Sequence, residues 1–273
     1  GVLELMENGE EWGITAEQLF LPAIRESERR ETFEQLLAAA EDAGIPVSYI
    51  KCGDEIRDSQ LRLLCLHPEE NTTLADANAY SECFYVEVFA KKMKQEAIDD
   101  RKANDASGAS AIGKISILLT GDVEGEGERQ LTQKLQALQE SQSLQESRSL
   151  QESRSLQESR SLQESQSLQE SQSLQLTRRL QEQRGQRKFR VDILKVAHHG
   201  SGYSTGTEFL TTASPATAII SCGRNNSYGH PHVETLQRLE DARVPWYGTM
   251  DYGALTVNVD SHGNRLRGYL RRK

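Results

Sequence analysis

Two stretches of this sequence decide the fold that we expect: ISILLTGD at residues 115–122 and VDILKVAHHGS at residues 191–201. Each begins with an apolar run of the length that a buried strand requires. Each run ends in polar residues that can carry chemistry, a Gly-Asp pair in the first and two adjacent histidines in the second. The pattern predicts two buried strands with functional residues at their carboxyl ends.

Helices and strands alternate around these two stretches. A helix is expected at residues 28–43, with Ser27 as its N-cap and Gly44 directly after its end. Further strands are expected at residues 45–50, 61–66, 83–89, 216–221, 244–247, 254–259 and 266–270, and further helices at residues 2–7, 205–213 and 233–242. This alternation predicts an α/β protein with mixed sheets covered by helices.

The composition excludes several classes of protein. With 273 residues, of which 36% are hydrophobic, the chain is neither a collagen, nor a small disulfide-stapled scaffold, nor wholly disordered. No stretch approaches 18 consecutive apolar residues, so the sequence predicts no membrane-spanning helix. The formal net charge of −9 is uneven, since residues 1–128 carry −15 and residues 129–273 carry +6. Four widely spaced cysteines form no C-x-x-C pair and are expected to act as small buried hydrophobes.

A repeat interrupts the sequence between the two deciding stretches. Six copies of the hexad LQES(Q/R)S run from Leu138 to Ser173. On a helix, successive leucines of a hexad fall about 240° apart, so they form no single apolar stripe. The repeat is therefore expected to be a low-complexity insertion with no catalytic role, either a nascent surface helix or disordered. We divide the chain into residues 1–137, with a polar loop at 91–113, then residues 138–190 as repeat and basic linker, and residues 191–273 as the continuation of the first part.

Three motifs carry the candidate chemistry, and each follows an apolar strand. The first is Gly121-Asp122, the second is HHGS at residues 198–201, and the third is NNSYGHPH at residues 225–232. Active sites of α/β sheets form outside the carboxyl ends of the strands. One acid and several histidines that converge there suit a divalent cation such as zinc. Since adjacent residues of a strand point to opposite faces, only one of His198 and His199 is expected to reach the site.

Each motif also has a structural interpretation. Gly-Asp is a common turn, and Asp122 could cap the helix that follows it. An isolated histidine is more often a satisfied core or surface residue than a ligand, and His232 is expected to start a helix. Only the set of three motifs, taken together, favours a metal site.

The strings ILLTGDVEGEGE (residues 117–128), VDILKVAHHGSGYST (residues 191–205) and AIISCGRNNSYGHPHVETLQRLEDARV (residues 218–244) resemble a known family. They are similar to the metallo-β-lactamase-fold domain of ComEC-type DNA-uptake competence proteins and to stand-alone hydrolases of the same fold. The resemblance covers nearly all of the chain outside residues 91–113 and 138–190. It implies an α/β fold of the αββα sandwich type with one or two zinc ions at one edge.

The resemblance also implies that part of the family pattern is missing. The family's first ligand motif, rich in His and Asp-His, does not occur in this chain. We therefore expect a partial sandwich that lacks the N-terminal strands and this first motif, either because the chain is a truncated piece or because it is a degenerate relative. Such a piece is expected to bind zinc weakly and to be inactive by itself.

Carried over residue by residue, the resemblance assigns roles to the three motifs. It implies metal ligands at Asp122, His198 or His199, and His230, with catalytic roles for Asp122, His199 and His230. Polar contacts to the substrate are implied at Asn78, Ser81, Ser201, Asn225 and Asn226, all of which are also ordinary turn residues.

The implied activity is metal-assisted hydrolysis of a phosphodiester, with DNA or another phosphoester as substrate. Two alternatives remain: a catalytically silent binding or scaffold domain, and a zinc hydrolase of a small ester unrelated to DNA. As part of a competence protein, the domain would belong to a membrane-embedded parent and face the outside of a bacterial plasma membrane. Otherwise it would be secreted or cytoplasmic, and the sequence does not specify an oligomeric state.

Overall fold

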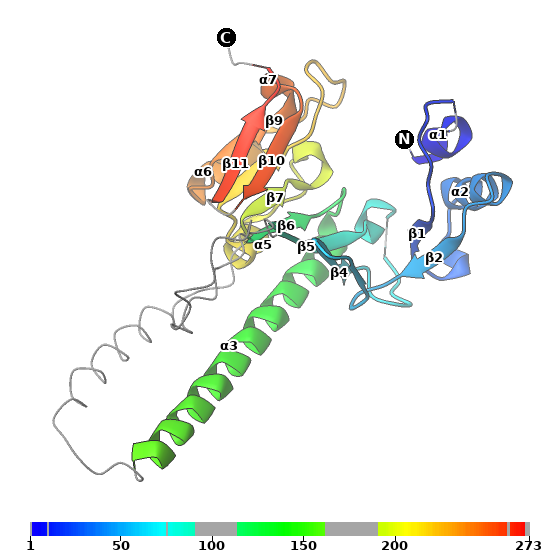
Figure 1. Cartoon of the computed structure of the whole chain (residues 1–273). Coiled ribbons are helices and arrows are strands. Elements are labelled where there is room, and N and C mark those ends of the chain that lie inside the picture. Colours follow the sequence, from blue (N-terminus) through cyan, green and yellow to red (C-terminus); the bar gives the residue numbers. More distant parts are fainter. Residues whose placement is uncertain are drawn as a thin grey trace, which may run out of the picture.

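A mixed seven-stranded sheet forms the centre of the computed structural model (Figure 1), which describes residues 2–9, 11–74, 76–90, 114–161, 191–260 and 263–270. The strands run in the spatial order β3-β4-β5-β6-β7-β8-β9. Their bounds are Glu55–Arg57, Leu61–His67, Cys83–Phe89, Lys114–Leu119, Ile193–Lys195, Thr217–Ile220 and Trp246–Gly248. Neighbours from β3 to β6 pair antiparallel, and neighbours from β6 to β9 pair parallel. The α/β class expected from the sequence is confirmed.

Two small sheets and several helices accompany the central sheet. Strands β1 and β2 pair in parallel, and β10 and β11 form an antiparallel hairpin. The bounds of these strands are Leu19–Pro22, Val47–Ile50, Leu255–Asp260 and Gly263–Gly268. The α-helices are α1 (Val2–Asn8), α2 (Glu31–Asp42), α3 (Gly125–Ser161), α5 (Thr207–Ala213), α6 (Val233–Asp241) and α7 (Thr249–Tyr252). Short 3-10 turns are η1 (Glu26–Glu28), η2 (Asn78–Tyr80) and η3 (Ala197–Gly200).

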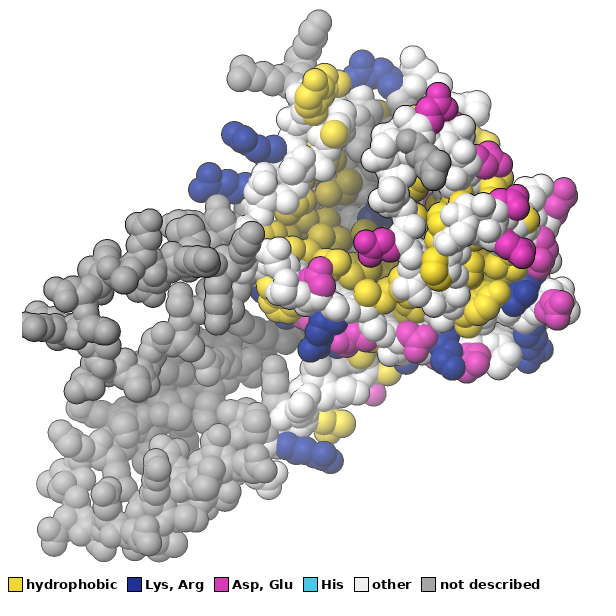
Figure 2. All heavy atoms as spheres, turned by 45° about the vertical axis from the view of Figure 1, so that its right-hand side comes forward, with side chains coloured by type: hydrophobic (Ala, Val, Ile, Leu, Met, Phe, Trp, Pro, Cys, Tyr) yellow, Lys and Arg dark blue, Asp and Glu magenta, His cyan; other side chains and the backbone are white. Residues whose placement is uncertain are grey.

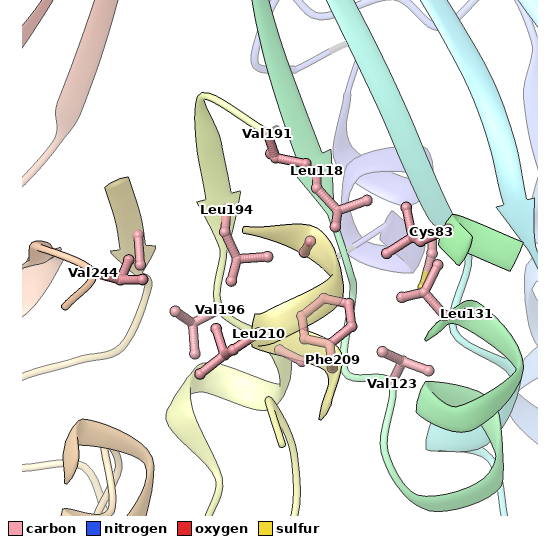
Figure 3. Close-up of a cluster of buried hydrophobic side chains, with 14 of the residues drawn as sticks. Cys83, Leu118, Val123, Leu131, Val191, Leu194, Val196, Phe209, Leu210 and Val244 are labelled. Atoms are coloured by element: carbon pink, nitrogen blue, oxygen red, sulfur yellow. The ribbon is translucent and has the colours of Figure 1, made fainter. Parts of the chain in front are cut away.

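The main core lies between the central sheet and the helices α3 and α5. Leu118 of β6 and Leu194 of β7 are fully buried and pack in one cluster with Leu131 of α3 and Phe209 of α5 (Figure 3). Burial of each such side chain stabilises the fold by about 1.5–3 kcal/mol. The two apolar stretches that opened the sequence analysis therefore form the middle of the core.

Pairing of β6 with β7 joins the parts of the chain that flank the repeat. Ile117 lies opposite Ile193, and the Asp192 carboxylate accepts hydrogen bonds from the backbone N and the hydroxyl of Ser116 at 2.7 and 2.8 Å. The two parts thus share one sheet and one core, although 73 residues separate the end of β6 from the start of β7.

Helix α3 runs from the domain into the hexads and is described as far as Ser161. Residues 138–161 of the repeat are therefore helical, as one of the two expected alternatives had it, and residues 162–190 lie outside the described part. Although the hexads form no single apolar stripe, the first turn of the repeat does meet the core. Leu138 packs against the main core, and the Gln139 amide donates to the Thr212 carbonyl at 2.7 Å. At this point α3 lies over α5.

The first turn of the repeat should therefore contribute to stability, and the later hexads should not. Leu138→Ala is expected to lower the free energy of unfolding by about 1 kcal/mol, because it removes a partly buried side chain from the core. Leu144→Ala is the matched control, since this leucine is 64% exposed and its loss should change the free energy by less than about 0.5 kcal/mol. Urea unfolding of both variants measures the difference. Equal values would show that the contact of Leu138 with the core has no energetic weight.

Two expected helix starts differ from the structure. Ser27 lies inside the turn η1, and α2 starts only at Glu31, with Arg30 at the N-cap position and no side-chain cap. The helix expected from residue 205 starts at Thr207, because Thr205 adopts a left-handed φ of 56°. The backbone N–H groups of Thr205 and Gly206 both donate to the Glu128 carboxylate, which holds this turn open ahead of α5.

The surface carries charged and hydrophobic side chains side by side (Figure 2). Acidic side chains are interspersed with hydrophobic ones on the face seen in Figure 2. None of the helices that the structure describes is both long and apolar enough to span a membrane. The polar segment 91–113 lies outside the described residues.

Candidate functional site

The carboxyl ends of β6, β7 and β8 lie along one edge of the central sheet, because these strands are parallel. Asp122 follows β6, the paired histidines follow β7, and the loop that carries His230 follows β8. The structure brings them together. The Asp122 Oδ1 atom lies 3.6 Å from Nε2 of His199, and the His230 ring centroid lies 5.5 Å from that of His198 and 6.4 Å from that of His199. We call His198, His199 and His230 the histidine cluster.

Asp122 is placed by a tight turn at the end of β6. Gly121 has φ +53°, and a Cβ atom there would lie 2.9 Å from Cβ of Ser81, so the turn needs glycine for two reasons. The Ser81 hydroxyl accepts a hydrogen bond from the Asp122 backbone N at 3.1 Å. Ser81 therefore supports the backbone of the acid.

Both paired histidines reach the cluster, contrary to the expectation that only one would. The expectation assumed that they continue the strand, but β7 ends at Lys195 and both residues lie in η3 with left-handed φ values of 45° and 56°. The His198 backbone N donates to the Gly121 carbonyl at 3.1 Å, which ties this turn to the turn before Asp122. Side chains do not alternate between two faces in such a turn as they do in a strand. The ring centroids of His198 and His199 therefore lie only 6.4 Å apart.

His199 is oriented by a carbonyl that can only accept. Its Nδ1 atom lies 2.5 Å from the Ser221 carbonyl oxygen, so Nδ1 carries the proton and donates it. In the neutral ring, Nε2 then has a free lone pair, and this lone pair faces a carboxylate oxygen of Asp122 at 3.6 Å. Two acceptors that face each other at this distance suit a cation between them. Ligating histidines are commonly held in this way through their second nitrogen.

His198 is held by an acid that the sequence analysis did not single out. Its Nδ1 atom lies 3.0 Å from Oε2 of Glu124, and the other carboxylate oxygen of Glu124 accepts from the Asn78 amide at 3.1 Å. The Asn78 side chain thus supports Glu124 and does not face an open surface where a substrate could bind. This relay leaves Nε2 of His198 free for another partner.

His230 is fixed through its backbone. Its N–H donates to the Asn226 side-chain oxygen at 3.0 Å, and the Asn226 amide donates back to the His230 carbonyl at 2.7 Å. The Nδ1 atom of the ring is buried and has no hydrogen-bond partner among the described residues. Burial, followed by the neighbouring charges of His232, His198 and His199, lowers the pKa of His230 below its usual range. The shift favours the neutral ring, which is the form that can bind a cation.

His232 differs from the other three because both of its nitrogens are occupied. Nδ1 accepts from the Gly202 backbone N at 2.9 Å, so Nε2 carries the proton and donates to the Tyr228 carbonyl at 3.1 Å. The residue also occupies the N-cap position of α6, as expected from the sequence. With no free lone pair, His232 bridges two loops and is no ligand in this arrangement.

The loop after η3 is clamped from two sides. The Arg238 guanidinium donates to the carbonyls of Thr205, Gly202 and Ser204 at 2.8–3.0 Å. On the other side, the Glu128 carboxylate binds the backbone of residues 205–206. Burial raises the pKa of Glu128, although these N–H donors oppose the shift. The clamp holds the histidine turn rigidly against the sheet.

The remaining residues implied as substrate contacts lie in two different settings. Ser201 is only 3% exposed, and its hydroxyl accepts from the Tyr203 backbone N at 3.3 Å. Asn225 is exposed and has a left-handed φ of 58° in the loop before the cluster. Of the five residues, Asn225 is thus the exposed one.

Lys195, which the sequence analysis missed, lies beside Asp122 at the end of β7. Its ammonium donates to the Gly121 carbonyl at 2.6 Å and lies 3.6 Å from Oδ1 of Asp122. Burial lowers the pKa of Lys195, and the nearby Asp122 charge opposes this shift. A lysine at the end of an apolar strand gives no signal of its own, since such residues are usually solvated.

The residues present fit a zinc site in chemistry but not in number. Two ligands of one tetrahedral zinc ion lie about 3.3 Å apart, which agrees with the 3.6 Å between Asp122 and His199. The His230 ring, whose buried Nδ1 atom has no hydrogen-bond partner among the described residues, lies beside this pair, with its centroid 6.4 Å from that of the His199 ring. Yet within the described ranges no three His, Cys, Asp or Glu side chains are close enough to form a ligand set. The arrangement offers one well-placed pair of metal ligands, Asp122 and His199, with further histidine nitrogens nearby.

Glu82 should make stability depend on pH. Burial raises the pKa of this carboxyl from 4.5 to about 7, and its Oε1 atom has no partner among the described residues. The folded state therefore retains a proton that the unfolded state loses as the pH rises from about 4.5 to about 7, and stability falls over this range. Glu82→Gln is expected to raise the free energy of unfolding by about 2 kcal/mol at pH 8 and to change it little at pH 4.5. The exposed Glu240→Gln is the control, and urea unfolding at both pH values is the measurement. An equal effect of Glu82→Gln at both values would contradict the raised pKa.

Comparison with known proteins places these features in context. No family model matches the chain. The chain is 26% identical to ComE operon protein 3 of Bacillus subtilis (strain 168) over 224 residues, which are 80% of this chain and 19% of that protein. It is 38% identical to Recombination protein 2 of Haemophilus influenzae over 69 residues, 25% of this chain and 9% of that protein. It is 34% identical to Competence protein ComA of Neisseria gonorrhoeae over 80 residues, 28% of this chain and 12% of that protein. The chain spans about a fifth or less of the length of these relatives.

Proposed function

We propose that this chain is a hydrolytic domain that cuts phosphodiester bonds of DNA during competence-related uptake. We further propose that its α/β fold is the metallo-β-lactamase αββα sandwich and that its cofactor is zinc. The similarity to a protein named for competence supports the biological context. The observation that carries the chemistry is the pair formed by Asp122 and His199, whose acceptor atoms face each other at 3.6 Å.

Asp122 and His199 would hold the ion, with His198 and His230 as further nitrogen ligands beside them. When bound, zinc lowers the pKa of water from about 16 to about 7 and polarises a phosphoryl oxygen. The Ser221 carbonyl keeps the proton of His199 on Nδ1, and Glu124 does the same for His198. The chain thus fixes in advance which ring nitrogens are free.

The surroundings of the site also suit an anionic substrate. The Lys195 ammonium lies next to the acid of the site, where it offsets the negative charge of Asp122 and attracts a phosphate. The His230 ring lies beside the pair and is suited to hydrogen-bond a departing oxygen. Asp122 is suited to orient a water molecule for attack, because its own backbone is held by Ser81.

A second candidate function is binding of DNA without hydrolysis. It is favoured by one observation, the lack of a complete set of three metal ligands in the part of the chain that the structure describes. A domain of this kind would use the same edge of the sheet as a recognition surface. The two functions differ in whether the DNA is cut.

Metal removal tests the proposal. The full chain is stripped of metal with EDTA, dialysed, and assayed on a fluorescently labelled oligodeoxynucleotide with and without added zinc. The missing first ligand motif implies an inactive chain, but the pair formed by Asp122 and His199 leads us to expect slow cleavage that appears with zinc and disappears on renewed chelation. Zinc binding should be weak, because only two metal ligands are well placed. Binding of the oligonucleotide without zinc-dependent cleavage would overturn the hydrolytic function in favour of the second candidate.

A further inference from the structure

Two tyrosines with very exposed side chains flank the histidine cluster. Tyr203 is 85% exposed and Tyr228 is 77% exposed. Single exposed aromatic side chains are common and need no explanation. These two, however, lie on the two loops that carry the candidate site, four residues after His199 and two residues before His230. Their position at the rim of the site suits a ligand with flat apolar faces that can stack on the two rings.

The loops that carry the two tyrosines are held together by one side chain. The His232 imidazole accepts from the backbone of Gly202, the neighbour of Tyr203, and donates to the backbone of Tyr228. The two backbones are therefore only about the width of one imidazole ring and two hydrogen bonds apart. Arg238 and Ser201 fix the first loop further through the carbonyl of Gly202 and the backbone N of Tyr203. The tyrosines are exposed, but their backbone is rigid.

The ring of Tyr228 is already aligned with the site. It lies parallel to the His230 ring, with an interplanar angle of 11° and a centroid distance of 5.8 Å. The His232 ring lies 4.8 Å from His230 on the same edge of the sheet. A flat group on the outer face of Tyr228 would therefore extend the stack that begins at His230.

The charge of these loops also bears on the partner. Residues 196–206 and 221–232 contain no Asp or Glu, and the second loop contains the exposed Arg224, whose guanidinium binds the Met250 carbonyl. The carboxylates of Glu128 and Glu234 lie against the first loop, on the neighbouring helices α3 and α6. This contrasts with the net charge of −9 of the whole chain. A partner with flat faces and negative charge is a nucleic acid strand. In a duplex the base faces are stacked on one another, whereas those of a single strand are free for aromatic side chains.

We propose that Tyr203 and Tyr228 form a stacking platform for the bases of single-stranded DNA, held in register by the His232 bridge. This inference rests on the proposed function, because it names the form of DNA that the site takes. It makes these tyrosines binding residues that position the strand and leaves the hydrolytic step to the cluster.

The test distinguishes binding through the bases of DNA from binding through its phosphates. Fluorescence anisotropy measures binding of the full chain, in EDTA, to a short labelled oligothymidylate, to an abasic oligomer of equal length, and to a duplex. We expect the oligothymidylate to bind about tenfold or more tightly than the other two. Tyr203→Ala and Tyr228→Ala should each weaken its binding by about tenfold and leave binding of the abasic oligomer unchanged. Equal binding of the three probes by the wild-type chain would overturn the proposal.

Matched variants separate stacking from a loss of structure. Tyr203→Phe and Tyr228→Phe retain the rings and should bind like the wild-type chain. Trp12→Ala removes a half-exposed aromatic side chain in the turn after α1 and should have no effect. Weakening by the Phe variants, or equal weakening for the abasic oligomer, would contradict stacking. Because the assay contains no metal, loss of the base preference overturns only the platform, and absence of zinc-dependent cleavage overturns only the proposed hydrolysis.

Discussion

Asp122→Asn is expected to lower zinc-dependent cleavage of DNA by about 100-fold or more. The substitution keeps the size of the side chain and removes its negative charge, so the acceptor that faces Nε2 of His199 no longer attracts a cation. The fold should survive, because Asp122 is 38% exposed and the hydrogen bond from its backbone to Ser81 is retained. Initial rates of oligonucleotide cleavage, together with zinc content by atomic emission, measure the effect.

The control for this variant is Asp241→Asn, an exposed aspartate at the end of α6 whose oxygen accepts only from the neighbouring Gln237 among the bonds that the structure records. It should match the wild-type chain in both rate and zinc content. If Asp122→Asn cleaved DNA and bound zinc as the control does, the role of Asp122 at the site would have to be abandoned.

Gly200→Ala is expected to lower the free energy of unfolding by about 3 kcal/mol. Gly200 has φ +89°, which a residue with a Cβ atom rarely adopts, and the added Cβ would lie 2.6 Å from Cβ of Pro231. Either the histidine turn or the loop that carries Pro231 must move. Because His199 and His230 lie on these two segments, zinc binding should weaken together with stability.

Gly223→Ala is the matched control in the same loop as His230. An added Cβ there meets nothing within 4 Å, and the change in stability should stay within about 0.5 kcal/mol. Urea unfolding of both variants makes the comparison. Similar stability of the two variants would mean that the two segments move apart to accommodate the added Cβ atom at little cost in free energy.

The strands of the central sheet could be predicted because their signal is local. The run from Ile115 to Thr120 and the run that ends before His198 are apolar over the length of a strand, and both form core strands. The length of α3 could not be predicted in the same way. Its hexads have no apolar stripe, and the helix continues from a first part that is anchored in the core by Leu131 and Leu135. Helix formation propagates more easily than it starts, so an anchored first part extends into a sequence that would not nucleate a helix alone.

The site could be predicted only as far as its residue types allowed. Asp122 and the histidines are recognisable because they follow apolar strands. Glu124 was not recognised as their support, because its partners Asn78 and His198 are 46 and 74 residues away in the sequence. The turn of the paired histidines was likewise hidden, since non-glycine residues adopt left-handed φ rarely and only where tertiary contacts hold them. Orientation of the rings is thus a property of the fold and not of the motif.

The long helix α3 has a consequence for how this sequence can change over time. From residue 141 onward, every position of the helix whose exposure is described is exposed. One copy more or fewer would change the reach of the exposed helix by about 9 Å and leave the sheet, the clamp and the histidines untouched. A change in the number of hexads beyond the first turn is therefore expected to leave the stability of the folded domain unchanged.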